Sequence, residues 1–403
     1  MVTAAARPYI DASVPVLREH GLTITTTFYR NMFAAHPELS NLFNMGNQAS
    51  GVQQQSLAAA VFAYAANIDN AAALAPVIAR IVHKHVSIGI KPAHYPIVGR
   101  YLLGAIADTI GDAATPDLLS AWEEAYTELA NLFIAAEQEL YGQAGVTAGT
   151  LRDMRVVKVE RQSANVTSYT LQAVNEQTVP SFTPGQYISV AVDFADGRRQ
   201  IRQYSLSDAP NSESLRISVK RESARQDTPQ GEVSNWLHQH VSIGSVLQVS
   251  HPFGEFVPDT ESIEPIVMLS AGVGITPMIA ALNRIAQVQP QRHMIFAHAV
   301  TNKEHHSHLA DVRAAMEVMP NLQVVNFYET LTDDAHTDIN AAAHAGWMDI
   351  AKLPKWPRTE TKVYLCGPAG FMKAQWLALL TAGVPVSHLH KEVFGPDLLD
   401  SLV

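Results

Sequence analysis

Residues 266–277 read Ile266-Val-Met-Leu-Ser-Ala-Gly272-Val-Gly274-Ile-Thr276-Pro277. The first six residues form a short apolar run typical of a buried strand, and the glycines that follow allow a tight turn. Thr276 and Pro277 have the character of an N-cap and a first helical residue, so we expect a helix to follow. A pyrophosphate binds well at such a helix N-terminus, where glycine lets the backbone come close. The stretch therefore predicts a nucleotide site, although a tight turn without a ligand explains the same glycines.

The sequence downstream of this stretch repeats the alternation of strand and helix. We expect strands over residues 266–269, 294–298, 322–328 and 362–365, and helices over residues 277–287, 307–318 and 370–382. Such alternation predicts an α/β domain with a parallel sheet of the nucleotide-binding kind.

The sequence upstream has two other textures. Short β-branched runs spaced by turn residues predict an antiparallel β-barrel, with strands over residues 156–160, 168–174, 186–194, 215–220 and 245–250. Before them the chain is Ala-rich and amphipathic, and helices are expected over residues 11–35, 53–67, 72–87, 97–110 and 116–140. The prediction is a multidomain chain: all-α over 1–147, β-barrel over 148–264 and α/β over 265–403.

Composition excludes several classes of protein. A length of 403 residues fits two or three domains. The net charge of -10, without a basic run, gives no electrostatic footprint for nucleic acid. The single cysteine, Cys366, excludes an intramolecular disulfide and disfavours a cysteine-ligated zinc. The N-terminus lacks a signal-peptide pattern and glycines break the most apolar window, so we expect a cytoplasmic chain without membrane insertion.

The helix expected over residues 116–140 carries an unusual carboxylate. Thr115 is its predicted N-cap and Pro116 its predicted first residue. Glu137 comes four residues after Phe133 and therefore falls on the apolar stripe. We expect this carboxylate either at the edge of the stripe or buried with a partner.

Arg202-Gln203-Tyr204-Ser205 ends a strand-like run in the β region. Arginine offers a planar fork for phosphate, tyrosine a face for ring stacking and serine a hydroxyl for a ring nitrogen. Arginine and tyrosine are also common on barrel strands, so these residue types alone do not establish a binding site.

Six short motifs follow one another from about residue 156 onward: Pro184-Gly-Gln-Tyr187, Arg202-Gln-Tyr-Ser205, Gly231-Glu-Val-Ser234, Gly272-Val-Gly-Ile-Thr-Pro277, Cys366-Gly-Pro368 and Glu392-Val-Phe-Gly-Pro396. With these motifs in this order, the chain resembles ferredoxin-NADP-reductase-like flavoproteins. The resemblance implies FAD-binding residues Tyr187, Arg202, Gln203, Tyr204, Ser205, Ser234, Val393, Phe394, Gly395 and Pro396. It implies NAD(P)-binding residues Ala271, Gly272, Val273, Gly274, Ile275, Thr276, Cys366, Gly367 and Pro368.

Individual roles follow from the same resemblance. Tyr204 is expected against the isoalloxazine and Arg202 at the pyrophosphate, with Phe394 closing one face of the flavin. Ser234 is expected to cap a helix that begins near Asn235 and presents N–H groups to phosphate. Cys366 is either an inert buried residue at the end of a strand or a contact of the nicotinamide.

The N-terminal third contains two closely spaced histidines, but His83 and His85 cannot readily share one metal, because residues two apart on a helix face different ways. Five strings surround them: Phe28-Tyr-Arg-Asn-Met-Phe33, His36-Pro-Glu-Leu39, Leu42-Phe-Asn-Met45, His85-Val-Ser-Ile-Gly89 and His94-Tyr-Pro-Ile-Val-Gly99. On these strings, roughly residues 9–141 closely resemble the globin domain of flavohaemoglobins.

The resemblance implies haem b with His85 as the proximal iron ligand and with Tyr95 and Glu137 as a hydrogen-bonded pair beside it. It implies Tyr29 as the distal hydroxyl donor, supported by Gln53. The implied pocket residues are Phe43, which packs on the haem, and Leu57, which crowds the iron. Lys84 and Glu392 are expected near the haem–flavin junction, where they would tune electron transfer.

The function implied by both resemblances is that of a nitric oxide dioxygenase. NAD(P)H would reduce FAD, FAD would reduce the haem, and dioxygen and nitric oxide would give nitrate, in a monomer. One alternative is an oxygen-binding or sensing globin whose reductase keeps the iron ferrous, and another is a flavin reductase with a vestigial globin. The histidines of the nucleotide domain are expected on the surface, with a metal site as the second choice: His293, His298, His305, His306 and His308.

Overall fold

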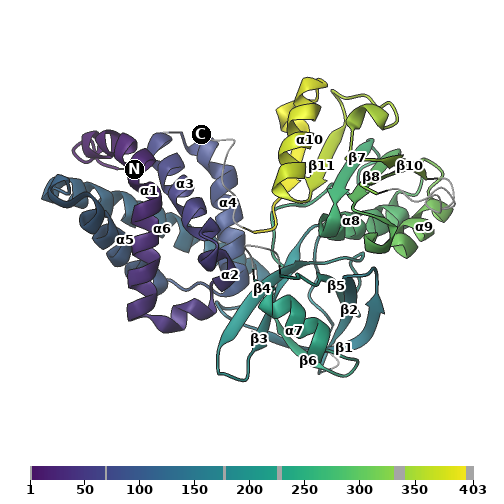
Figure 1. Cartoon of the computed structure of the whole chain (residues 1–403), viewed down its shortest axis with the longest axis horizontal. Helices are drawn as coiled ribbons and strands as arrows, with labels where there is room; N and C mark the ends of the chain where they lie inside the picture. Colours follow the sequence, from purple (N-terminus) through teal and green to yellow (C-terminus); the bar gives the residue numbers. More distant parts are fainter. Residues whose placement is uncertain (1, 69, 176–177, 225–228, 331–340, 396–403) are drawn as a thin grey trace. The chain divides into compact units, whose positions relative to one another are not determined.

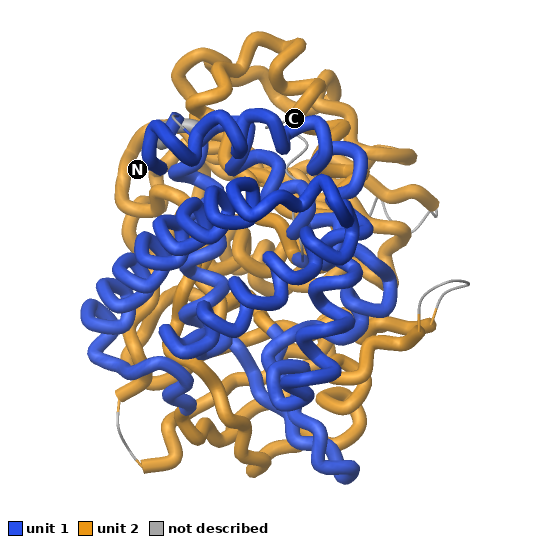
Figure 2. Tube along the Cα trace, turned by 90° about the vertical axis from the view of Figure 1, so that its left-hand side faces the viewer, with its two compact units in different colours: residues 1–151, 189–202, 395–403 blue, residues 152–188, 203–394 orange. Residues whose placement is uncertain are grey.

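The computed structural model describes residues 2–68, 70–175, 178–224, 229–330 and 341–395 (Figure 1). The chain divides into two compact units (Figure 2). The first comprises the described residues of 1–151 and 189–202 together with Gly395, and the second comprises those of 152–188 and 203–394. Among the described residues, no helix combines the length and apolar character needed to cross a bilayer.

The N-terminal third is helical, as predicted. Its helices are α1 Arg7–Ala35, α2 Met45–Ala49, α3 Val52–Ala66, α4 Ala71–Ile88, α5 His94–Ile110 and α6 Pro116–Ala144. The predicted start of α6 is confirmed, because Thr115 Oγ1 accepts a hydrogen bond from Leu118 N at 3.3 Å and Pro116 is the first helical residue. The short helix α2 was not predicted.

The second region is an antiparallel sheet in the order β4-β3-β6-β1-β2-β5, which confirms the predicted class. Its strands are β1 Arg152–Arg161, β2 Val166–Ala173, β3 Tyr187–Asp193, β4 Arg199–Ser205, β5 Leu215–Lys220 and β6 Val246–Val249. Helix α7, Glu232–His240, lies between β5 and β6 in the sequence.

The C-terminal region contains the predicted parallel sheet, in the order β10-β9-β8-β7-β11-β12. The strands are β7 Ile266–Ala271, β8 Met294–Val300, β9 Leu322–Tyr328, β10 Ala342–Ala345, β11 Lys362–Cys366 and β12 Leu389–Glu392. The helices are α8 Ile275–Val288, α9 Leu309–Val318 and α10 Ala369–Thr381. The four-residue edge strands β10 and β12 were not predicted.

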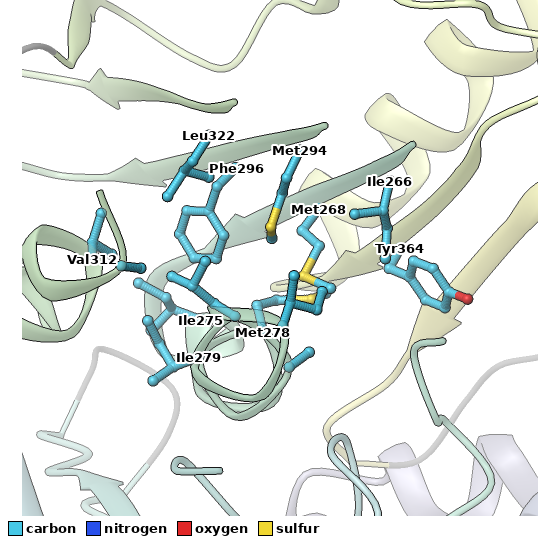
Figure 3. Packing of buried hydrophobic residues seen from close by; sticks show 14 of the residues in the cluster. Ile266, Met268, Ile275, Met278, Ile279, Met294, Phe296, Val312, Leu322 and Tyr364 are labelled. Carbon is cyan, nitrogen blue, oxygen red and sulfur yellow. The ribbon is translucent and has the colours of Figure 1, made fainter. Parts of the chain in front are cut away.

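Alternate residues of the parallel strands face two different cores. Figure 3 shows Met278 and Ile279 of α8 against Met268 and Phe296 of the sheet. Val267 and Leu269 belong to the opposite core, which includes Leu379 of α10. Helices therefore cover both faces of the sheet, which explains why its strands are almost continuously apolar.

The strand order reverses between β7 and β11, because β8 and β9 lie on one side of β7 and β12 lies beyond β11. In open α/β sheets, ligands bind beyond the carboxyl ends of the strands at such a reversal. The turn Gly272–Gly274 follows β7, and Cys366 is the last residue of β11. The turn after β7 and the turn that begins at Cys366 pack closely together. A methyl group on Gly274 would overlap the carbonyl oxygen of Cys366.

We predict that Gly274→Ala lowers the free energy of unfolding by about 1–3 kcal/mol, because the new methyl group meets fixed backbone rather than a flexible side chain. Urea denaturation of the full chain measures this change. Gly370→Ala is the matched control: it lies in α10, and a methyl group there meets no atom within 4 Å. Equal stability of the two variants would contradict the close packing of the turns.

Candidate functional site

Three helices bring His85, Tyr95 and Glu137 together. His85 Nδ1 lies 2.7 Å from Glu137 Oε1 and 3.1 Å from the hydroxyl of Tyr95, and this hydroxyl donates to the same Glu137 oxygen at 2.5 Å. Glu137 is only 2% exposed. Of the two predicted environments for this carboxylate, burial with a partner is confirmed.

The tautomer of His85 follows from its neighbours. A carboxylate offers only acceptors, so the imidazole donates through Nδ1 and its Nε2 carries the lone pair. Within the described part of the chain, Nε2 has no hydrogen-bond partner, and the side chain is 29% exposed. Burial and Glu137 together raise the pKa of Tyr95 far above its ordinary value, so Tyr95 remains a donor. The donor set fits a histidine that would bind haem iron through Nε2 while Glu137 holds its second nitrogen.

Tyr126 on α6 supports this group from behind. Its hydroxyl donates to the backbone oxygen of Tyr95 at 2.6 Å. Its ring passes directly over Gly99 on α5, where a Cβ would lie 2.5 Å from a ring carbon. Glycine at position 99 therefore gives Tyr126 the room it needs to hold the first turn of α5.

A second cluster surrounds Tyr29 on α1, which is 4% exposed. The ring centroids of Phe33 and Phe43 each lie 5.7 Å from that of Tyr29. Gln53 Nε2 donates to the Tyr29 hydroxyl at 3.4 Å, as the predicted pairing requires. Burial raises the pKa of Tyr29 to about 12, so the hydroxyl keeps its proton at neutral pH. Leu57, one turn after Gln53, packs against the same cluster.

Helices α3 and α4 leave apolar side chains only partly covered. Leu57 and Val61 of α3 are partly buried against the core that contains Tyr29, and Ile78 and Ile81 of α4 against the core that contains Tyr95. Helix α3 packs chiefly on α1, and α4 on α6. A flat apolar ring between α3 and α4 would cover these side chains, which is a second reason why the residues fit a haem.

The predicted flavin motifs lie on β4, β3 and α7. Arg202, Gln203, Tyr204 and Ser205 are consecutive residues of β4, and Ser205 is 6% exposed. Tyr187 is the first residue of β3 and exchanges two backbone hydrogen bonds with Phe253, at 2.8 and 2.9 Å. Gly185 has a φ of +101°, and a Cβ there would overlap the carbonyl oxygen of Phe256. The motif that ends in Tyr187 therefore requires glycine at its second position.

Three family models match successive parts of the chain. They describe a globin over residues 26–132, an oxidoreductase FAD-binding domain over 153–257 and an oxidoreductase NAD-binding domain over 268–376. A flavohaemoprotein of Chromobacterium violaceum is 45% identical over 401 residues, 98% of each chain. The one of Deinococcus radiodurans is 45% identical over 405 residues, also 98% of each. The chain belongs to the flavohaemoprotein family.

Solved structures agree with this assignment. The flavohaemoglobin of Malassezia yamatoensis, solved with bound FAD and haem, is 27% identical with a TM-score of 0.85 and covers 98% of this chain and 100% of its own. The FAD/NAD-binding part of a nitric oxide dioxygenase from Vibrio cholerae is 34% identical with a TM-score of 0.55, covering 61% of this chain and 99% of its own. This flavohaemoprotein is therefore an oxidoreductase that combines a globin with FAD- and NAD-binding domains.

Two predicted helix caps of the flavohaemoprotein are wrong. Helix α8 begins at Ile275 after a 3-10 turn over Gly272–Gly274, and Thr276 Oγ1 donates back to Val273 O at 3.0 Å. Helix α7 begins at Glu232 after Gly231. Ser234 lies inside it, donating to Gly231 O and accepting from Glu222 N, both at 3.2 Å. In both cases a preceding glycine supplies the turn, so the helix starts earlier than the hydroxyl residue.

The C-terminal motif is described only in part, because Pro396 lies outside the described residues. Val393, Phe394 and Gly395 follow β12, and Phe394 is 44% exposed. Glu392 is 7% exposed and aligns with Cys366 in the register of β11 and β12. Lys84 Nζ donates to Gly395 O at 2.5 Å. The predicted tuning roles of Lys84 and Glu392 remain predictions.

Cys366 is fully buried at the end of β11. Burial, with a smaller contribution from Glu392, raises the pKa of its thiol well above the ordinary value. A raised thiol pKa favours the protonated thiol over the nucleophilic thiolate. Contact of Cys366 with the nicotinamide remains a prediction.

The sequence analysis missed Gln48 of α2, whose side chain acts on the Tyr29 hydroxyl, and Gln54 of α3, which pairs with Gln48. Gln54 Nε2 donates to Gln48 Oε1 at 3.0 Å, and Gln54 O accepts from Thr25 Oγ1 at 2.9 Å. Gln48 is 9% exposed, and its Nε2 has no partner among the residues that the structure describes. Asn44, which caps α2 by accepting from Gly46 N at 3.0 Å, is the sequence signal that would have revealed this short helix.

The prediction for the histidine cluster is wrong at three positions. His298, His306 and His308 are 0%, 3% and 0% exposed, whereas His293 is exposed and His305 half-buried. His298 lies on β8 in the middle of the sheet and pairs with Ser270 Oγ at 2.9 Å, and His306 pairs with the Tyr328 hydroxyl at 2.8 Å. Among the described residues, no group of three or more His, Cys, Asp or Glu side chains is arranged to hold a metal ion.

Burial of His298 generates a prediction about acid stability. Burial, followed by the neighbouring histidines, holds its pKa well below the ordinary value. Below about pH 6.5 this histidine is protonated in the unfolded chain, where its pKa is about 6.5, but stays neutral in the folded chain. His298 should therefore contribute its whole share to the free energy of unfolding above about pH 6.5. That contribution should decrease as the pH falls from about 6.5 toward the pKa of His298 in the folded protein.

Urea midpoints between about pH 7.5 and about pH 5 measure this slope. In His298→Gln the slope should become shallower, whatever the absolute stability of the variant. His293→Gln removes an exposed histidine and should leave the slope unchanged. A His298→Gln slope equal to that of the unsubstituted protein would refute the assignment.

Proposed function

We propose that this flavohaemoprotein is a nitric oxide dioxygenase: NAD(P)H reduces FAD, FAD reduces the haem, and nitric oxide and dioxygen give nitrate. The observation that carries the proposal is the hydrogen bond from His85 Nδ1 to the buried carboxylate of Glu137. A carboxylate partner makes an imidazole more electron-donating, which favours oxygen activation over oxygen storage. The similarity to the FAD/NAD-binding domain of the nitric oxide dioxygenase from Vibrio cholerae supports the same activity.

The helical region would hold haem b through His85 Nε2. When bound, the haem supplies the iron at which dioxygen and nitric oxide react. On the proximal side, Glu137 and Tyr95 fix the imidazole ring and its tautomer. Tyr29 would offer its protonated hydroxyl to a ligand bound at the iron, and Phe43 and Leu57 would provide apolar walls around it.

Gln53 determines where the proton of Tyr29 points. The amide donates to the hydroxyl oxygen at 3.4 Å, so the hydroxyl keeps its own proton for another acceptor. A donor that is held in place before the reaction stabilises negative charge without having to reorganise. Tyr29 is therefore the residue that we expect to donate a hydrogen bond to a ligand bound at the haem iron.

The remaining motifs would hold the flavin and the nucleotide. FAD would contact Tyr187, β4 from Arg202 to Ser205, the α7 region at Ser234 and the segment that begins at Val393. NAD(P)H would bind at the reversal of the parallel sheet, against residues Ala271 to Thr276 and Cys366 to Pro368. The position of these turns at the carboxyl ends of β7 and β11 supports this assignment.

We further propose that the chain works as a cytoplasmic monomer, with functional boundaries near residues 148 and 264. The single cysteine fits a reducing compartment. Size-exclusion chromatography with light scattering tests the oligomeric state.

Substitution Tyr29→Phe tests the proposed activity. We expect nitrate formation to fall and oxygen to dissociate faster, each by about tenfold, because one donor to the ligand is lost. Stopped-flow mixing of the oxygenated protein with nitric oxide, with nitrate assay, measures both. Tyr64→Phe is the matched control, since the Tyr64 hydroxyl donates only to the backbone oxygen of Ala125, at 3.3 Å. Faster oxygen release with undiminished nitrate would instead indicate an oxygen-binding protein.

Substitution Glu137→Gln tests the proximal assignment. Loss of the charge should raise the haem reduction potential by on the order of 50 mV, because an imidazole without a carboxylate partner donates less electron density and stabilises the oxidised iron less. Spectroelectrochemical titration measures the potential, and the iron–histidine vibration should move to lower frequency. Glu139→Gln is the control, because Glu139 lies on the same helix with an exposed side chain. An unchanged potential in Glu137→Gln would exclude the proposed role of this carboxylate.

A further inference from the structure

A buried charge pair joins the antiparallel sheet to the nucleotide-binding region within one compact unit. Arg216 on β5 donates from its guanidinium to Asp311 Oδ1 on α9 at 2.7 Å. Their side chains are 10% and 11% exposed. Neither residue belongs to a motif that the sequence analysis singled out.

Two further side chains complete the network. Asn283 on α8 donates from Nδ2 to Asp208 Oδ1 at 2.8 Å and to Asp311 Oδ1 at 2.9 Å. Arg216 Nε lies 3.6 Å from Asp208 Oδ2 and donates to Ser207 O at 3.0 Å. The network therefore consists of two residues from the sheet side, Arg216 and Asp208, and two from the nucleotide side, Asn283 and Asp311.

The charge of Asp311 is well compensated. Its second oxygen, Oδ2, lies 2.8 Å from Nδ1 of His308, a fully buried residue with a left-handed φ of +64°. Burial opposes ionisation of Asp311, but His308, Arg216 and Asn283 outweigh it and hold the pKa of Asp311 below its ordinary value. An ionised Asp311 thus faces the Arg216 cation in a largely water-free interface.

The network connects the two elements that matter for hydride transfer. Ser207 and Asp208 lie two and three residues after the end of β4, the strand that carries Tyr204 and Ser205. Asn283 lies on α8, the helix that begins at the Gly272–Gly274 turn. One set of hydrogen bonds therefore links the proposed flavin strand to the helix that starts at the proposed nucleotide turn.

We propose that Arg216, Asp208, Asn283 and Asp311 are positioning residues that fix the nucleotide-binding region against the flavin-binding sheet and so set the rate of hydride transfer. A buried ion pair is weak evidence for stability, but its directed hydrogen bonds define one relative orientation. Reacting atoms must be held close and aligned, and a displacement of about 1 Å can cost about a hundredfold in rate.

The proposal rests on the proposed function, since it requires that NAD(P)H reduces FAD. In that step the C4–H bond of the dihydronicotinamide breaks and its hydrogen leaves with both electrons. A new N–H bond forms at N5 of the flavin. The products are NAD(P)⁺ and the anionic reduced flavin, FADH⁻, so atoms and electrons balance without another reactant.

The test compares flavin reduction in full-length Arg216→Met and Asp311→Asn with the unsubstituted protein. Each variant is mixed with NADH without oxygen, and flavin absorbance is followed over a range of NADH concentrations. We expect the limiting rate of flavin reduction to fall by about tenfold to a hundredfold. The dissociation constant for NADH and the FAD content should change less than about threefold, because neither residue belongs to a proposed binding motif. Arg313→Met, on the exposed face of α9, is the control and should keep the full rate.

A double variant separates positioning from stability. Arg216→Met alone leaves the Asp311 carboxylate uncompensated, and Asp311→Asn alone leaves the Arg216 cation uncompensated. The double variant Arg216→Met with Asp311→Asn removes both charges and keeps an amide that can still pair with Asn283 and His308, so its thermal stability should recover. If the network positions the two regions, the double variant remains slow in hydride transfer although its melting temperature recovers. If the rate recovers together with the melting temperature, the network is only structural and the proposal is overturned.

Two further outcomes decide the matter. Should the charge variants fail to fold, Asn283→Ala removes only a neutral donor, and a limiting rate within twofold of the unsubstituted protein would overturn the proposal. Weaker NADH binding with an unchanged limiting rate of flavin reduction would overturn the proposal as well. The assay uses neither nitric oxide nor oxygen, so a protein that made no nitrate would refute the proposed function without affecting this result.

Discussion

The carboxylate of Glu137 is the constraint around which the helical region is organised. A charge that is 2% exposed is costly unless hydrogen bonds compensate it, and here the donors are His85 of α4 and Tyr95 of α5. Because Glu137 belongs to α6, its two hydrogen bonds fix how three helices meet. Tyr126 extends the constraint by holding the backbone of Tyr95. The apolar stripe of α6 is thus built around one charged group.

Much of this arrangement could be predicted from the sequence, because its signals are local. The helical period predicted that Glu137 falls on the apolar stripe. A threonine N-cap followed by proline at the first helical position predicted that α6 begins at Thr115 and Pro116. The same chemistry failed at Thr276 and Ser234. At both positions the glycine before the helix makes the turn, so the helix begins before the hydroxyl residue. Gly274 also packs against the backbone of Cys366, and this contact could not be predicted because Cys366 lies far away in the sequence.

The other errors also arise from contacts that are distant in sequence. Histidine is intermediate in its tendency to be buried, so burial depends on its partners. The partners of His298 and His306 are Ser270 on β7 and Tyr328 on β9, both distant in the sequence. Strands β10 and β12 each span four residues at a sheet edge, too short to show a hydrophobic period. The motif residues were found because they occur in a recognisable order. The Arg216–Asp311 pair was not, because neither residue stands in a motif.

The buried charges around Glu137 and Arg216 share a physical logic. Apolar burial stabilises packed helices and sheets but has no direction, so many slightly shifted arrangements would be nearly as stable. A hydrogen bond between buried charged groups has a narrow range of distances and angles, so it selects one arrangement at some cost in desolvation. In the helical region this selection concerns one imidazole ring. At β5, α8 and α9 the hydrogen bonds select one orientation of the nucleotide-binding region against the antiparallel sheet. In our proposal this orientation matters because hydride transfer depends on the distance between its donor and acceptor atoms more than on the total stability of the protein.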